Sequence, residues 1–233
     1  MATRLGPLRP LRATALAVVL LLGVAACGGD GDDADRAEST ASASPTESAE
    51  PTDDPSSSHG ISDAPEPDDP CVTDAAGAGQ AAGDGFAFAP PKGWQDVSDQ
   101  LTAALTGGNV SGIAWADRAS VDDGFADNLN VIVTADTGVD DVEQLREQFS
   151  TELSQAASDV TPGEDREVAC ETALYQTATT TQQGHDLVYD QVLVVRDGDT
   201  YVLTFTHTAD TPAATRETVV SGTLASWKWV EDE

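Results

Sequence analysis

The chain contains few of the residues that usually carry chemistry. Its 233 residues include three cysteines, three histidines and one methionine, and 11 basic residues stand against 41 acidic ones. A chain this acidic repels phosphate groups, which argues against nucleic acid as a partner and against a basic face that docks on anionic lipid. Its longest uncharged apolar segment is 14 residues, whereas a helix needs about 20 apolar residues to span a bilayer.

Motifs of common enzyme classes are absent from the sequence. It has no Gly-x-Ser-x-Gly turn, no His-Glu-x-x-His, no Gly-rich phosphate loop ending in Lys and no Cys/His zinc spacing, so no metal or cofactor is expected. His207 alternates with Leu203 and Phe205 on a predicted strand, a pattern that favours a packed, hydrogen-bonded histidine. The alternative is a small cell-envelope hydrolase or transferase that uses His207 as its general base.

The amino-terminal segment has the pattern of a secretory signal. Arg4, Arg9 and Arg12 precede the uncharged residues 13–26, and Ala25 and Ala26 lead into Cys27. This segment resembles the lipobox of bacterial lipoprotein precursors. The resemblance implies that residues 1–26 are removed, that the Cys27 thiol takes a diacylglycerol, and that further acylation, such as with palmitate, completes the lipid anchor. A transmembrane helix is the alternative interpretation, but 14 apolar residues with no positive flank after them favour the lipoprotein.

Removal of the leader would leave eight basic residues against 41 acidic ones, a formal net charge of −33. Residues 27–70 are rich in Ser, Pro, Asp and Glu, with Ile61 as the only large aliphatic residue. Such a segment buries too little apolar surface to offset its ordering entropy, so we expect a disordered acidic tether. The covalent lipid is then the link to the extracytoplasmic face of the cell membrane.

Residues 71–233 are predicted to form one domain. Turn signals and period-two alternation predict strands over 85–89, 112–116 and 129–135, and a three-strand meander over 172–182, 187–196 and 200–208. Helices are predicted over 99–105, with Ser98 as its cap, over 140–157, and from 211 to 228. Because both faces of the meander are partly apolar, helices should cover both. The expected fold class is α+β, with an antiparallel sheet in an α/β/α sandwich.

The order of these patterns resembles the PsbP-like fold family. The resemblance rests on Phe86-x-Phe88-x-Pro90-Pro91-x-Gly93-Trp94, on Asn128-Leu129-Asn130-Val131, and on the long helix, the meander and the terminal helix with Trp227. With the lipobox and the acidic tether added to this order, the sequence resembles the actinobacterial LpqN-type lipoproteins. The PsbP-like family includes members that act by binding proteins, and it has no shared catalytic residues. The resemblance therefore implies a binding or accessory module of the cell envelope, with a protein or envelope ligand as its partner.

Two further expectations concern particular side chains. Cys71 and Cys170 are the only cysteines left once Cys27 is lipidated, and in an exported protein they are expected to form a disulfide, with buried free thiols as the alternative. The four tryptophans are expected in the core or at its rim. Trp229, predicted to be exposed, is the candidate for stacking on a ligand.

Overall fold

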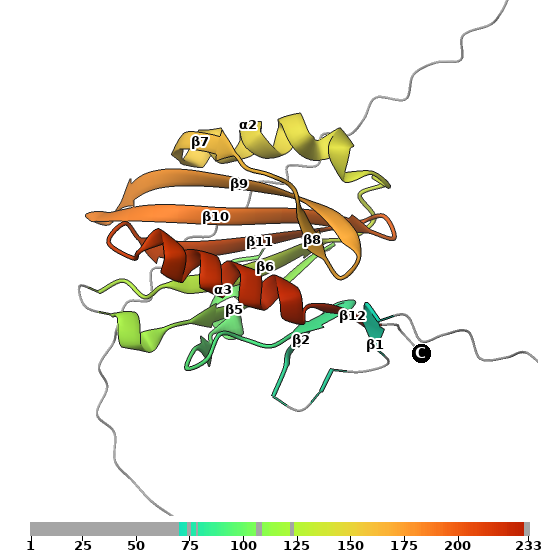
Figure 1. Cartoon of the computed structure of the whole chain (residues 1–233), viewed down its shortest axis with the longest axis horizontal. Helices are drawn as coiled ribbons and strands as arrows, with labels where there is room; N and C mark the ends of the chain where they lie inside the picture. Colours follow the sequence, from blue (N-terminus) through green and yellow to red (C-terminus); the bar gives the residue numbers. More distant parts are fainter. Residues whose placement is uncertain (1–69, 74–75, 78, 106–108, 122–123, 231–233) are drawn as a thin grey trace, which may run out of the picture. The chain divides into compact units, whose positions relative to one another are not determined.

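The computed structural model describes residues 70–230, apart from 74–75, 78, 106–108 and 122–123. Two sheets and three α-helices make up this part of the chain, and the cartoon in Figure 1 shows the long strands side by side with α3 lying across them. Among the described residues, no helix combines the length and the apolarity needed to cross a membrane.

The larger sheet has eight strands, and every pairing in it is antiparallel, as the sequence predicts for the meander. In spatial order its strands are β4 (Gln95–Asp96), β5 (Val110–Ala116), β6 (Asn128–Thr134), β11 (Asp199–Thr208), β10 (His185–Arg196), β9 (Glu171–Gln182) and β7 (Ser158–Pro162), with β8 (Arg166–Val168) pairing with the other end of β9. Asp197 and Gly198 form the turn between β10 and β11, where both have positive φ.

The smaller sheet was not predicted. Its spatial order is β1 (Val72–Thr73), β12 (Lys228–Val230), β3 (Phe86–Phe88) and β2 (Ala81–Gly83). The β1–β12 pairing is parallel and joins the two ends of the described chain. Phe86, Phe88 and Trp227 stack with ring centroids 4.5 to 6.2 Å apart, which gives this sheet an aromatic interior.

The helices are shorter than predicted. They are α1 (Ser98–Thr102), the 3₁₀ helices η1 (Arg118–Ser120) and η2 (Val142–Leu145), α2 (Arg146–Ala156), which continues η2, and α3 (Ala213–Ser226). Asp141 accepts a hydrogen bond from the Glu143 amide and caps the start of η2. The predicted cap at Ser98 is wrong, because Ser98 is the first helical residue and its hydroxyl bonds to Asp96.

The main core lies on one face of the larger sheet. Val220 and Leu224 of α3 pack there with Val192 and Leu203, and the smaller sheet adds Phe86 and Trp229. That face is therefore covered by a sheet as well as a helix, and not by helices alone as expected. On the opposite face, Val142, Leu145 and Phe149 pack against Leu174 and Leu193.

Candidate functional site

His207 lies at the centre of a buried polar cluster. Its Nδ1 is 3.0 Å from Oδ2 of Asp127, which precedes β6, and the two side chains are only 1% and 11% exposed. The Asp127 carboxylate also accepts bonds from the Thr208 amide and the Thr211 hydroxyl. Since Asp127 accepts at every contact, Nδ1–H of His207 is the donor in the bond between them. The packed, hydrogen-bonded His207 of the sequence analysis is what the structure shows.

This cluster lacks the contact that a general base needs. Nε2 of His207 is buried and has no hydrogen-bond partner, and the nearest described ring is that of Trp94, in an edge-on arrangement at 6.3 Å. A base that activates a nucleophile holds a hydroxyl or thiol within hydrogen-bond reach. In residues 70–230, where described, no group of three or more His, Cys, Asp and Glu side chains is placed to hold a metal ion.

A surface hollow of about 380 Å³ lies near this cluster, at the start of β10. It is lined by Ser120, Phe125, Gly184, His185, Asp186, Thr208, Ala209 and Asp210. The His185 ring lies 5.9 Å from that of Phe125, and both residues line this hollow. His207 is absent from the lining. The hollow can offer hydrogen bonds from His185 and carboxylates from two aspartates to a ligand.

A second hollow, of about 430 Å³, lies at the far end of β10. It is lined by Asp84, Gly85, Arg196, Asp197, Asp199, Tyr201 and Val230. Burial, followed by the charges of Asp199 and Asp197, raises the pKa of Tyr201 to about 12. Its phenol therefore stays protonated and can donate a hydrogen bond, but it cannot serve as a base near neutral pH.

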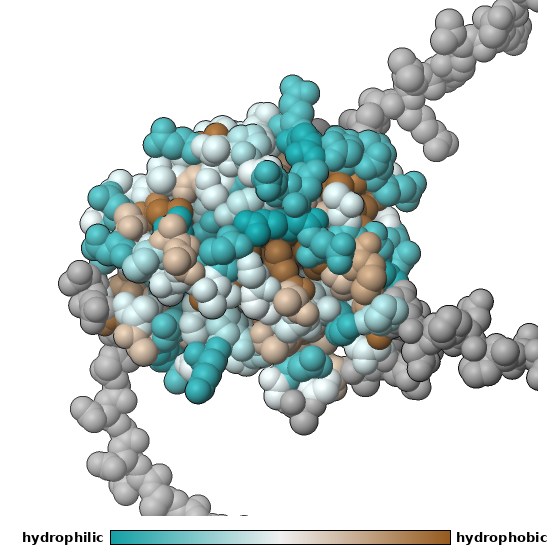
Figure 2. Space-filling model, in the orientation of Figure 1, coloured by the Kyte–Doolittle hydropathy of each residue, from teal (hydrophilic) through white to brown (hydrophobic). Residues whose placement is uncertain are grey.

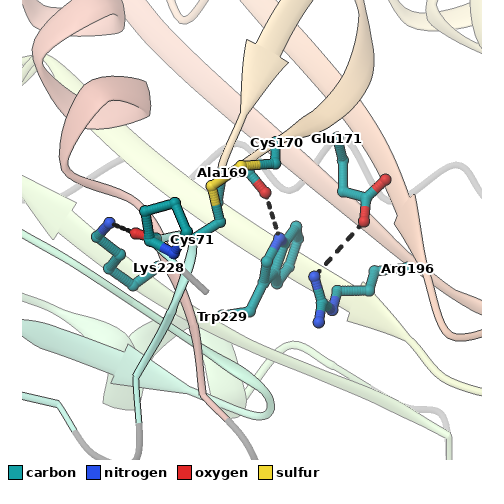
Figure 3. Close-up of a disulfide and its surroundings, with 8 residues drawn as sticks. Cys71, Ala169, Cys170, Glu171, Arg196, Lys228 and Trp229 are labelled. Carbon is teal, nitrogen blue, oxygen red and sulfur yellow. Dashed lines mark hydrogen bonds and ion pairs between the residues drawn. A yellow bond between two sulfur atoms is a disulfide. The ribbon is translucent and has the colours of Figure 1, made fainter. Parts of the chain in front are cut away.

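Trp229 lies behind this second hollow, and the expectation that it is exposed is wrong. Its side chain is 1% exposed because β12 runs between β1 and β3 and directs the ring into the core. The indole N–H donates to the Ala169 carbonyl at 2.9 Å, and the Arg196 guanidinium lies 5.1 Å from the ring centroid. Figure 3 shows the Arg196 guanidinium beside the Trp229 ring, with Glu171 as its ion-pair partner.

The Cys71–Cys170 disulfide stands beside Trp229 (Figure 3). The two Cα atoms are 6.0 Å apart, within the range that a disulfide spans, and the pairing predicted from the sequence is confirmed. Ala169 and Cys170 both have positive φ in the turn between β8 and β9. Lys228 donates a hydrogen bond to the Pro70 carbonyl, so three links hold the start of the domain. Cys27 lies outside the described residues.

Sequence reasoning missed Asp127 as the partner of His207. It also missed Asp84 and Arg196 as lining residues of the second hollow. Asp127 and His207 are 80 positions apart, and no local pattern marks the aspartate as a partner. Asp84 and Arg196 line the same hollow because the smaller sheet lies at this end of the larger one. The Asp197-Gly198 turn is a hairpin signal in the sequence, and Asp197 lines one edge of this hollow.

No protein-family model and no curated protein matches the chain. Among solved structures, LpqN of Mycobacterium tuberculosis, described as involved in cell envelope biogenesis, is similar at 13% identity, with 63% of this chain and 83% of that chain covered and a TM-score of 0.43. The Ran-binding protein Mog1p of Saccharomyces cerevisiae is similar at 12% identity, with 63% and 91% covered and a TM-score of 0.43.

A Bacteroides thetaiotaomicron protein is similar at 13% identity and a TM-score of 0.42, with 63% of this chain covered, and the match spans 46% of that longer chain. All three TM-scores lie below 0.5. Neither the family nor the function of this chain follows from them.

Proposed function

We propose that the protein is a lipoprotein, anchored through Cys27 at the extracytoplasmic face of the cell membrane, that acts as a binding or accessory module of the cell envelope. The leader, the Ala25-Ala26-Cys27 sequence and the acidic Ser/Pro-rich segment support the anchor and the location. A PsbP-like α/β/α sandwich of the LpqN type is the corresponding proposal for the domain. The partner is a protein or another envelope ligand.

The observation that carries the binding function is the state of His207. Nδ1 of His207 is held by the Asp127 carboxylate, which also accepts hydrogen bonds from Thr208 at the end of β11 and from Thr211. Nε2 of His207 is buried, so the described residues leave no route by which a substrate could reach it. Both described hollows near the ends of β10 are open and polar, unlike the enclosed and mostly apolar pockets that small ligands usually occupy, so we propose a partner's surface as the ligand.

Figure 2 supports this view for the face that it shows. Brown apolar areas are small and separated by teal and white ones, so this face presents a mixed surface without one continuous apolar patch.

The test is capture from envelope extracts by the full chain retained on a membrane support. A partner that is retained by the wild-type protein, and lost after charge reversal at Asp84 and Asp199 or at Asp186 and Asp210, supports the proposal. The two pairs line different hollows and serve as each other's control. Failure of both pairs to change any captured component contradicts binding through these hollows.

The Asp127–His207 contact favours a second candidate, the small hydrolase or transferase. A carboxylate on Nδ1 is the arrangement that orients a histidine base in many enzymes. Turnover of an envelope substrate by the purified protein, lost in His207→Gln with the melting temperature unchanged, would establish the enzyme. Equal loss of stability and of any activity supports the structural role.

A further inference from the structure

The hollow beside the turn between β10 and β11 gathers hydrogen-bond acceptors from segments that are far apart in the sequence. Its volume is about 430 Å³, and its lining includes Asp84, which precedes β3, together with Asp199 and Tyr201 of β11. Asp84 is exposed and Asp199 is half-buried, so a ligand can reach both carboxylates from solvent.

The Tyr201 hydroxyl belongs to a buried side chain and yet lies at this hollow. Tyr201 is 5% exposed, and its ring packs against the rings of Phe86, Trp227 and Trp229. The hydroxyl has no hydrogen bond to any described residue. A Cβ atom at Gly85 would lie 3.0 Å from Oη of Tyr201, so the glycine keeps the space beside the hydroxyl open. Because buried phenols are usually hydrogen-bonded, the partner of this one has to come from the hollow.

The two carboxylates also have acceptor capacity to spare. Asp199 accepts a hydrogen bond from the Asp136 amide through Oδ1, and no described residue donates to its Oδ2. Asp84 forms no hydrogen bond or ion pair with a described residue. An ionised carboxylate has about four sites at which it can accept a hydrogen bond. The hollow therefore offers acceptors to a ligand that brings several donors.

Arg196, the cation of this hollow, is held by other groups. Its guanidinium pairs with Asp197 at 3.3 Å and with Glu171 at 3.5 Å. It also lies 5.1 Å from the centroid of the Trp229 ring, as Figure 3 shows together with Glu171. Arg196 therefore leaves the charges of Asp84 and Asp199 without a paired cation in the described part of the chain.

The electrostatic potential at the Tyr201 hydroxyl is negative. Burial is the main cause that raises the pKa of Tyr201 to about 12, and the charges of Asp199, Asp197 and Asp84 act in the same direction. Arg196 acts against them, but its effect is smaller than that of Asp199 or of Asp197. A hollow with this balance of charges attracts a cation.

The acceptors suit a compact ammonium group better than other cations. They do not belong to any described group of side chains placed to hold a metal ion. A guanidinium binds best to a carboxylate that offers both oxygens, and one oxygen of Asp199 already serves the Asp136 amide. An ammonium group has three donors, one each for Asp84, Asp199 and Tyr201. Val230, which also lines the hollow, can contact the methylene stem of a lysine.

The ammonium group has to come from another protein. The chain has two lysines, and Lys228 donates to the Pro70 carbonyl. Asp84 precedes β3, whereas Lys92 lies beyond the other end of that strand. A second copy of the chain is disfavoured as the source, since each copy has a net charge of −30.

We propose that this hollow binds the ammonium group of a lysine side chain of a partner protein, with Asp84, Asp199 and the Tyr201 hydroxyl as its acceptors. This inference deepens the proposed binding function, on which it rests, by naming the surface and the chemistry that the partner presents. The partner's surface around this lysine should be basic or neutral, because Asp197 also lines the hollow.

The probe is a tripeptide with one lysine between two alanines and with blocked ends, so that the side chain carries its only charge. The protein is the mature chain, residues 27–233, labelled with nitrogen-15 and carrying Cys27→Ser so that no detergent is needed. We expect saturable shifts of the amide resonances of Gly85, Tyr201 and Val230, with a dissociation constant on the order of 1 mM. The same peptide with an acetylated lysine should cause no such shifts, and an arginine peptide should bind more weakly.

Two variants of the protein test the acceptors. Tyr201→Phe keeps the packed ring and removes only the hydroxyl, and it should weaken binding of the lysine peptide by about threefold. Asp84→Asn changes an exposed residue and should weaken binding by about fivefold. Asp99→Asn is the matched control, because Asp99 is an exposed aspartate of α1 that lines neither of the two hollows near the ends of β10. It changes the net charge equally and should leave the affinity within about twofold.

Several results would overturn the inference. Absence of saturable shifts, or shifts confined to residues outside the hollow, rejects the site. Equal weakening by Asp84→Asn and Asp99→Asn would mean that only the overall charge of the protein attracts the peptide. Unchanged binding by Tyr201→Phe, or tighter binding of the arginine peptide, contradicts an ammonium group held by the hydroxyl.

The envelope capture separates this result from the proposed function. A partner captured equally by the wild-type protein, Asp84→Asn and Tyr201→Phe leaves the binding function standing and rejects the lysine site. Capture of no partner by any of these proteins, together with no binding of the lysine peptide, rejects both.

Discussion

Asp127 and His207, 80 positions apart in the sequence, are joined by a hydrogen bond of 3.0 Å between Oδ2 and Nδ1, and both residues are buried. The bond links the residue that precedes β6 to the end of β11. Thr208 and Thr211, which lead towards α3, donate hydrogen bonds to the same carboxylate. One carboxylate therefore fixes three segments of the chain.

Asp127→Ala should lower the free energy of unfolding by about 3 kcal/mol, because it leaves buried donors of His207 and Thr208 without an acceptor. Chemical denaturation measures the change. Asp210→Ala is the control, since Asp210 is exposed and lies close in sequence to the same cluster. Similar stabilities for the two variants would contradict a structural role for the cluster.

Reduction of the Cys71–Cys170 disulfide should destabilise the domain, with an upper limit of about 4 to 5 kcal/mol from the entropy of closing a loop with a sequence separation of 99. The double variant Cys71→Ser, Cys170→Ser should match the reduced protein in denaturation experiments and show no response to reductant. Peptide mapping without reduction should recover the two cysteines joined. Two freely alkylated thiols in the native protein would disprove the pairing.

Cys27→Ser should release the protein from the membrane fraction or leave it unprocessed, because the acyl chains of the proposed anchor supply the membrane affinity. Fractionation and intact-mass measurement of the purified protein check this. Cys71→Ser, which leaves the lipobox intact, should stay with the membrane. An unmodified Cys27 in membrane-extracted protein contradicts the anchor.

The free energy of unfolding should fall at high pH, because two buried tyrosines ionise less readily in the folded protein than in the unfolded chain. Burial raises the pKa of Tyr189 to about 12, and burial aided by Asp199 and Asp197 does the same for Tyr201. A tyrosine in the unfolded chain ionises near pH 10, so the stabilising contribution is complete below about pH 10 and is lost as the pH rises through the folded value.

Tyrosinate absorbance should therefore appear only above about pH 10 and together with unfolding. Tyr189→Phe should remove part of this pH dependence, because the Tyr189 hydroxyl is buried with no hydrogen-bond partner. A phenol that titrates near pH 10 in folded protein would show that the burial does not persist in solution.

Much of the larger sheet could be predicted because its signals are local. The Asp197-Gly198 turn sets the register of β10 and β11, and the spacing of Val142, Leu145, Phe149 and Leu153 gives the buried side of η2 and α2. The same spacing continues to Ala156, but Ala156 is exposed because α2 ends there.

The smaller sheet could not be predicted as a sheet, although the strand predicted over 85–89 contains its β3. Its other strands have two or three residues, which is too short to show a period. β1 and β12 are strands only because distant segments pair, as Val72 does with Trp229. The burial of Trp229 depends on the same pairing with a distant segment, so the local sequence did not predict it. Residues near the end of a chain are more often exposed. Sequence reasoning identified the reactive side chains but not the neighbours that restrain them.

The disulfide also determines how the domain would respond to mechanical load. A pull on residue 70 enters the domain at Cys71 and passes through a covalent bond to Cys170, at the start of β9. β9 is one of the two longest strands and is paired with β7, β8 and β10, so the tension reaches the middle of the larger sheet. The tension does not pass through the backbone of residues 72–169. The two-residue pairing of β1 with β12 is therefore not the first to break under a pull on residue 70.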